Sequence, residues 1–81
     1  MRLDKFLKVA RILKRRTIAN EAASAGKIEV NGRVAKPSAK LSVGDIVAVH
    51  FASGKLVFEV LDLKETVKKD QAQLLYKVIA Q

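Results

Sequence analysis

The sequence predicts an α+β fold in which two N-terminal helices pack on a small, mostly antiparallel sheet. Three observations support this prediction. Apolar residues recur at helical spacing near the N-terminus, the apolar period changes to two from Lys27 onward, and Asn31-Gly32 is a strong signal for a hairpin turn. With 81 residues, of which 49% are hydrophobic and 30% charged, the chain is expected to fold as a single domain over residues 1–81.

The first helix is expected over residues 3–10. Four apolar residues there follow the spacing i, i+3, i+4 and i+7 and form one stripe: Leu3, Phe6, Leu7 and Ala10. Asp4 falls in the first turn, where free backbone N–H groups and the helix dipole favour a carboxylate. We interpret Asp4 as a helix-start residue that also orients a neighbouring cation, Arg2 or Lys8.

A second helix is expected over residues 18–25. Thr17 is predicted to be its N-cap, because a threonine hydroxyl accepts from the backbone N–H two or three residues on. Ile18, Ala22 and Ala25 are predicted to share its packing face, where small alanines allow close approach to the first helix. Gly26 supplies the left-handed residue that ends the helix.

The remaining chain is expected to form the sheet. A hairpin runs from Lys27 to Lys36 and is stopped by Pro37. Residues 46–51 and 55–63 are almost continuously apolar, which predicts strands in the buried middle of the sheet. Residues 66–74 are expected to form a loop with a helical turn, and residues 75–80 a last strand.

The positive charge is concentrated in one half of the chain. Residues 1–40 hold eleven cations against three acids, whereas residues 41–81 hold five of each, so the whole net charge of +8 lies in the first half. A one-sided basic surface favours a polyanion such as nucleic acid. Arg15 and Arg16 lie near the expected start of the second helix, whose free N–H groups also attract phosphate.

Other chemistries find little support in the sequence. The chain has no cysteine and one histidine, His50, so we expect no metal, no cofactor and no catalytic residue. No apolar run approaches membrane-spanning length, so we expect no membrane partner and a cytoplasmic location. The four aromatic residues fall at core-like positions: Phe6, Phe51, Phe58 and Tyr76. Recognition of RNA is therefore expected to rest on phosphates and shape rather than on stacked bases.

Several motifs, in order, resemble the S4 RNA-binding domain family. They are R-L-D-K-F-L at residues 2–7, K-R-R-T at 14–17, A-x-x-A-G-K-I at 22–28, V-N-G at 30–32, the proline at position 37 and G-D at 44–45. The resemblance implies an S4-type fold, with a core of about residues 1–51 whose two helices and adjoining hairpin bind RNA. Residues 52–81 would complete the sheet.

The whole chain, from MRLDKFLKVARILKRRT through LKETVKKDQAQLLYKV, is similar to a narrower group. It resembles the RqcP (YabO-type) family of S4 proteins in bacterial ribosome-associated quality control. The resemblance implies a monomeric, ribosome-associated, non-catalytic factor. Such a factor binds large ribosomal subunits carrying stalled peptidyl-tRNA, contacts the helix 69 region of 23S rRNA and the P-site tRNA, and assists RqcH in C-terminal alanine tailing.

The resemblance also selects site residues. In this family the arginines that match Arg2 and Arg16 are the central RNA contacts, and Asp4 belongs to the same motif. Charge and position add further candidates: Lys5, Lys8, Arg11, Arg15, Thr17, Lys27, Arg33 and Lys36. Three alternatives stay open, namely a large-subunit recycling factor of the heat-shock protein 15 type, an accessory domain for RNA modification, and a protein–protein module.

Overall fold

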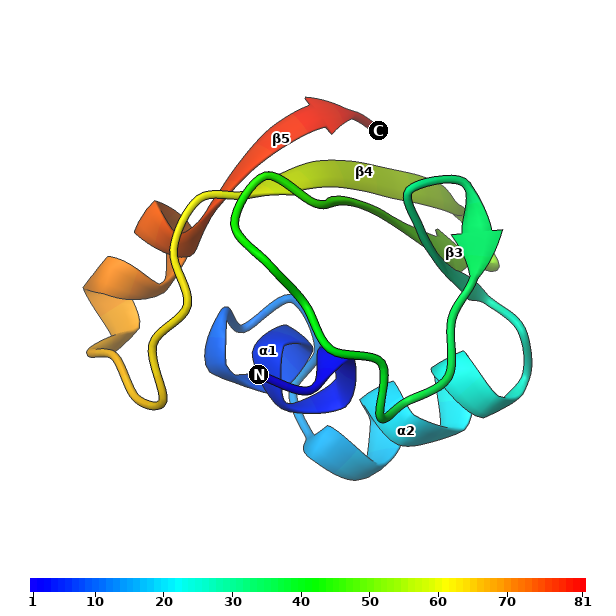
Figure 1. Cartoon of the computed structure of the whole chain (residues 1–81), viewed down its shortest axis with the longest axis horizontal. Coiled ribbons are helices and arrows are strands. Elements are labelled where there is room, and N and C mark those ends of the chain that lie inside the picture. The colour runs from blue at the N-terminus through cyan, green and yellow to red at the C-terminus, as the bar shows by residue number, and fades with distance from the viewer.

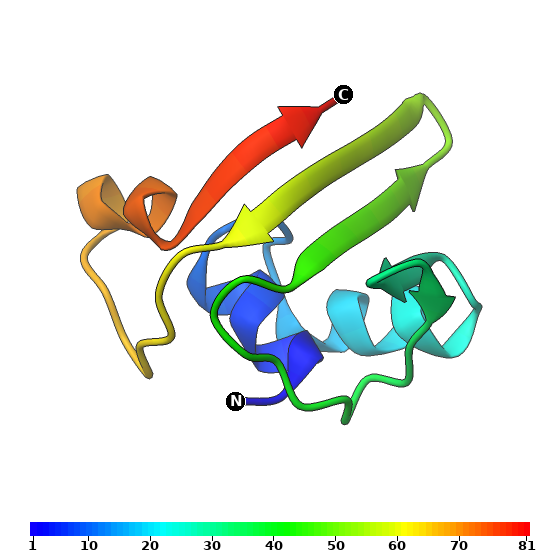
Figure 2. The same ribbon diagram turned by 45° about the horizontal axis from the view of Figure 1, so that its top comes forward.

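The structure, a computed structural model, describes all 81 residues. Two helices, α1 (Leu3–Val9) and α2 (Arg16–Ser24), precede the sheet. The elements that follow are β1 (Ile28–Val30), β2 (Arg33–Val34), β3 (Ile46–Phe51), β4 (Gly54–Val60), the 3₁₀ helix η1 (Lys69–Leu75) and β5 (Tyr76–Ala80). All neighbouring strands are antiparallel, in the order β2-β1-β3-β4-β5. Both α-helices lie on one side of this sheet (Figures 1 and 2), so the predicted α+β class is confirmed.

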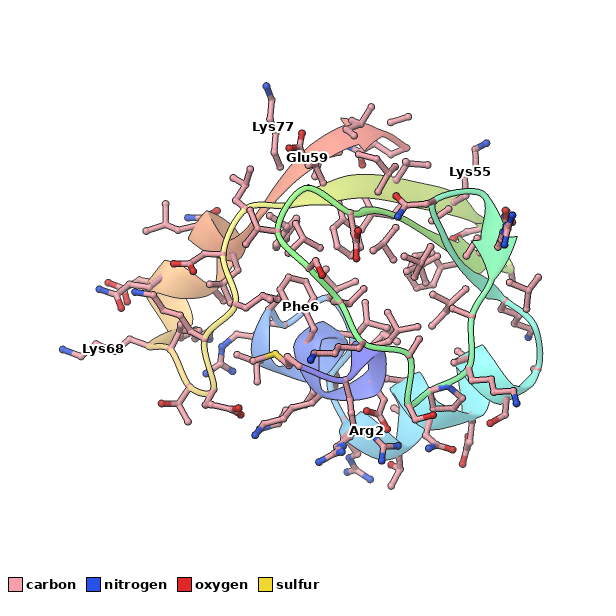
Figure 3. The ribbon with its side chains drawn as sticks, in the orientation of Figure 1. Arg2, Phe6, Lys55, Glu59, Lys68 and Lys77 are labelled. Atoms are coloured by element: carbon pink, nitrogen blue, oxygen red, sulfur yellow. The ribbon has the colours of Figure 1, made fainter.

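The core lies between α1 and the sheet. The predicted apolar stripe of α1 is fully buried, and the ring of Phe6 stacks on that of Phe58 with centroids 6.1 Å apart. The rings of Tyr76 and Phe58 also meet edge-on, with centroids 5.4 Å apart. Figure 3 shows Phe6 pointing from α1 toward the strands. None of the helices is long and apolar enough to cross a bilayer.

Two predictions about α2 are wrong. The helix begins at Arg16 with Arg15 as the N-cap, so Thr17 lies inside the first turn and makes no capping hydrogen bond. The buried face is formed by Ala19 and Ala23, whereas Ile18 is 42% exposed. The predicted end is correct, because Gly26 has a left-handed φ of 77°.

The β1–β2 hairpin confirms the turn prediction. Asn31 and Gly32 have φ angles of 52° and 83°, as the favoured two-residue turn requires. The Asn31 side chain also fixes the neighbouring strand, since its Oδ1 accepts from the backbone N–H of Ile46 at 2.9 Å. Its Nδ2 donates to Asp45 Oδ1 at 3.1 Å.

The central strands are buried on one face only. Val47 and Val49 of β3 point into the core, and His50 and Phe51 are exposed. The predicted core position of Phe51 is therefore wrong: it is the last residue of β3, paired with Gly54 where the hairpin extends beyond the helices (Figure 2), and is 41% exposed. The predicted helical turn and last strand are confirmed as η1 and β5, and β4 ends at Val60, three residues earlier than expected.

Candidate nucleic-acid interface

A buried carboxylate holds two arginines at the N-terminal end of α1. The side chain of Asp4 is only 2% exposed. Arg2 binds it through two parallel hydrogen bonds from one edge of its guanidinium, because Nε donates to Oδ1 and Nη2 donates to Oδ2, each at 3.1 Å. Arg16 Nε lies 3.5 Å from Oδ1. One acid thus holds two cations, Arg2 and Arg16, that are fourteen positions apart in the sequence.

Backbone bonds place Asp4 and Arg2. The first N–H groups of a helix have no partner within the helix, and here a separate segment supplies them. The N–H of Leu3 donates to the carbonyl of Ala39 at 2.8 Å, and that of Asp4 to the carbonyl of Pro37 at 3.1 Å. The N–H of Lys5 donates to Asp4 Oδ1 at 2.8 Å. The loop after the hairpin therefore anchors the start of α1.

Helix α2 presents Arg16 and Asn20 to the same carboxylate. These residues are four positions apart and so share a face of the helix. Asn20 Nδ2 donates to Asp4 Oδ2 at 3.4 Å. Because α2 begins at Arg16, residue 16 lies one turn before residue 20 on the same face of the helix. Sequence reasoning missed Asn20, whose i, i+4 spacing from Arg16 was the available signal.

The charges of this cluster leave a positive surface. Burial disfavours the ionised form of Asp4, but hydrogen bonds from Arg2 and Asn20, the nearby charge of Arg16 and the Lys5 N–H outweigh it, so the pKa of Asp4 lies below its ordinary value of 3.8. Two guanidiniums share one carboxylate, and their side chains are 48% and 47% exposed. The cluster is thus a fixed, outward-facing pair of arginines with one net positive charge.

The first turn of α2 adds hydrogen-bond donors. The backbone N–H groups of Arg16, Thr17 and Ile18 precede the first intrahelical bonds, and no other hydrogen bond uses them. Arg15 is exposed at the N-cap position. A helix N-terminus of this kind, flanked by arginines, has the features of an anion site.

A groove of about 560 Å³ continues this surface between α2 and the loop that follows the β1–β2 hairpin. Arg2 and Asn20 border it on the helix side, and Lys36 and Ser38 border it on the loop side. Figure 3 shows Arg2 projecting from the side of the molecule opposite to the sheet. The groove therefore joins the arginine pair to Lys36, a cation of the loop after the hairpin.

The structure divides the other predicted residues into groups. Lys27 and Arg33 are exposed on the hairpin, beyond the groove. Lys5 is paired with Glu65, and this contact lowers the pKa of the Glu65 carboxyl. Lys8 and Arg11 line a separate hollow against residues 65–67. The predicted set is therefore not one continuous patch.

Comparisons with known proteins show the family to which the chain belongs. The family model described as "S4 domain" matches residues 1–47. The RQC P-site tRNA stabilizing factor of Streptococcus pneumoniae is 48% identical over 81 residues, covering all of this chain and 92% of that protein. The protein of the same name from Bacillus subtilis is 46% identical over 79 residues, covering 98% and 92%. The chain belongs to the S4 domain family of RQC P-site tRNA stabilizing factors.

Solved structures of S4-type proteins share the whole fold. Heat shock protein 15 of Vibrio cholerae, described as trimeric, superposes with a TM-score of 0.91 at 30% identity over 99% of this chain and 82% of its own. The solution structure of the hypothetical protein HP1423 gives 0.84 at 28% identity, covering 100% and 99%. Strands β4 and β5 of this S4 protein lie beyond the residues matched by the family model and extend the same sheet.

Proposed function

We propose that this S4 protein is a non-catalytic RNA-binding factor of ribosome-associated quality control. In this proposal residues 1–81 act as one domain that binds the large ribosomal subunit carrying stalled peptidyl-tRNA. The observation that carries the proposal is the arginine pair held by Asp4, in a chain 48% identical to a named RQC P-site tRNA stabilizing factor. A rigid pair of guanidiniums suits phosphate oxygens, because each presents a planar fork of donors.

The proposed mechanism is positional. Arg2 and Arg16 bind neighbouring phosphates, and the free N–H groups of α2 with Thr17 and Arg15 add donors beside Arg16. Asp4 does not touch RNA in this scheme, because it is buried. It acts as a positioning residue that removes the conformational freedom of both arginines before RNA arrives.

The outer cations extend the binding field. Lys36 borders the groove next to Arg2, and Lys27 and Arg33 lie on the adjoining hairpin. Lys8 and Arg11 add positive charge on another side of α1, and Lys5 contributes less because Glu65 partly neutralises it. Long-range attraction of this kind raises the rate of association with RNA and weakens as salt screens it.

The proposed partners are two RNA molecules and one protein. We propose contact with the helix 69 region of 23S rRNA and with the P-site peptidyl-tRNA, and assistance to RqcH during C-terminal alanine tailing. The protein would act as a ribosome-associated cytoplasmic monomer. The name of the bacterial relatives, RQC P-site tRNA stabilizing factor, supports a role in quality control and an interaction with P-site tRNA.

Recovery of bound RNA and protein from cells tests this proposal. A tagged chain is expected to recover large-subunit rRNA, tRNA and RqcH, whereas the Arg16→Ala variant is expected to lose all three while keeping the circular dichroism spectrum of the wild type. Deletion of the protein is expected to shorten or abolish alanine tails on stalled chains. Recovery of free rRNA precursors alone would contradict the proposal and favour a role in RNA modification.

A heat-shock protein 15-like recycling role is the second candidate, because the Vibrio cholerae protein shares the fold at a TM-score of 0.91. The heat shock protein 15 homologue of Aeromonas salmonicida is 35% identical, and this chain covers only 59% of it. Unchanged alanine tails after deletion, together with retained binding to large subunits, would favour this candidate.

A further inference from the structure

A second groove lies on another side of the molecule, between the end of α1 and η1. Its volume is about 550 Å³. Arg11 borders it from the chain after α1, and Lys69, Gln73 and Tyr76 border it from η1 and the start of β5. None of the residues that line it lines the groove beside Arg2, so this groove does not continue the arginine pair at Asp4.

Arg11 stands at a position where the backbone favours glycine. The helix ends at Val9 with Ala10 as its C-cap, and Arg11 follows with a left-handed φ of 59°. Glycine usually occupies this place, because a side chain there is strained. The backbone N–H of Arg11 donates to the carbonyl of Lys8 at 3.0 Å, a bond that needs no side chain. Strain at a cationic residue beside a groove points to a use for its side chain.

The polar groups of this groove have no partners within the protein. Neither Arg11 nor Lys69 takes part in any of the five ion pairs, and Asp70 is the single acid on the groove wall. The amide of Gln73 and the hydroxyl of Tyr76 make no side-chain hydrogen bond. Two cations beside an amide and a phenol match the phosphates and the ribose or base edges of a nucleic-acid strand.

We propose that this groove is a second RNA site, which binds a stretch of RNA backbone separate from the one held by Arg2 and Arg16. Arg11 and Lys69 would each contact a phosphate, and Gln73 and Tyr76 would bond the sugar or base edges between them. The inference rests on the proposed function. Two RNA sites on different sides of one small rigid domain would hold two RNA segments in a fixed relation to each other.

Salt dependence and thermal stability together test the role of these cations. The variant Arg11→Gly/Lys69→Gln is measured for binding to purified large ribosomal subunits carrying P-site tRNA over a range of salt concentrations. Losing two phosphate contacts is expected to flatten the slope of log affinity against log salt by roughly 1.4–1.8. The matched control Lys55→Gln, on β4 and pointing away from the helices in Figure 3, is expected to leave the slope unchanged.

Arg11→Gly alone separates binding from folding. Because glycine relieves the left-handed strain, its unfolding midpoint is expected to equal or exceed that of the wild type while its RNA affinity falls. A lower midpoint together with lower affinity would show a structural role and overturn the inference. So would a double variant whose slope matches that of Lys55→Gln.

Crosslinking tests whether the two RNA segments are separate. The chain has no cysteine, so Ser38→Cys in the first groove and Asp70→Cys in the second each carry a single photoreactive label. The two labels are expected to crosslink different RNA segments. Crosslinks to the same nucleotides, or crosslinks from position 70 to protein alone, would overturn the second site. Arg16→Ala is measured in parallel, and wild-type binding by that variant would instead overturn the proposed function.

Discussion

Replacing Asp4 by asparagine separates positioning from simple charge attraction. The substitution removes one negative charge and raises the formal net charge from +8 to +9, with no large change in volume. Charge attraction alone then predicts tighter binding to RNA. The structure predicts weaker binding, because the neutral amide no longer holds Arg2 and Arg16 in one arrangement. The two explanations therefore differ in the sign of the effect.

The magnitude follows from the contacts of the carboxylate. It accepts two bonds from Arg2 at 3.1 Å and one from the Lys5 N–H at 2.8 Å, and Arg16 lies 3.5 Å away. Breaking a fully buried ion pair costs about 3–5 kcal/mol. Solvent reaches about half of each arginine side chain, which reduces the expected loss of unfolding free energy to about 1–3 kcal/mol. Each kcal/mol lowers Tm by roughly 4–8 °C in a domain of this size.

The assay compares Asp4→Asn with Glu21→Gln, which makes the same change of charge. Glu21 is exposed on α2 and takes part in no ion pair. Affinity for large ribosomal subunits is expected to fall about 5–30-fold in Asp4→Asn, equivalent to 1–2 kcal/mol, and to stay equal or rise slightly in Glu21→Gln. If Asp4→Asn binds as tightly as Glu21→Gln and unfolds at the wild-type temperature, the positioning role of Asp4 is refuted.

Three further predictions concern the fold and its pH dependence. The pKa of Asp4 is lower in the folded state, so its stabilising contribution is present above pH 3.8 and is lost as the pH falls below that value. In urea unfolding, the free energy of unfolding should therefore decrease at acid pH, and this decrease should be smaller in Asp4→Asn than in the wild type. Phe58→Ala should lower the unfolding free energy by about 3–5 kcal/mol, whereas Phe51→Ala should cost about 1 kcal/mol or less because that ring is exposed; equal losses would contradict the described core. Asn31→Ala should lower the free energy of unfolding by about 1–3 kcal/mol, since it removes two hydrogen bonds to the start of β3 and places alanine at a positive φ. Chemical denaturation measures this loss, and an unchanged midpoint would show that these hydrogen bonds do not stabilise the fold.

The elements predicted well from the sequence are those that local chemistry determines. The apolar stripe of α1 and the Asn31-Gly32 turn depend on spacing and on backbone preferences within a few residues. Helix α2 begins two residues earlier than predicted. Arg16 and Asn20 both contact Asp4 of the other helix, and such contacts between distant segments are not part of the local capping preference that selected Thr17.

The candidate site was predicted in part for the same reason. Charge counting and motif resemblance found Arg2, Arg16 and Asp4, but neither shows that Asp4 is buried between the arginines. The second groove depends on η1 packing near Arg11, residues about sixty positions apart along the chain. The outer face of the sheet is not covered by an α-helix, because both α-helices pack on the same side. The apolar sequence of the strands alone predicted burial on both faces.

The salt dependence of binding to large ribosomal subunits tests the central claim most directly. For about five neutralised phosphates, the slope of log affinity against log salt is expected to be roughly −3.5 to −4.5. In the Arg2→Ala/Arg16→Ala variant the slope should flatten by roughly 1.4–1.8, with affinity reduced at every salt concentration. An affinity that is nearly independent of salt, or a slope unchanged by the loss of both arginines, would contradict RNA binding through the pair held by Asp4.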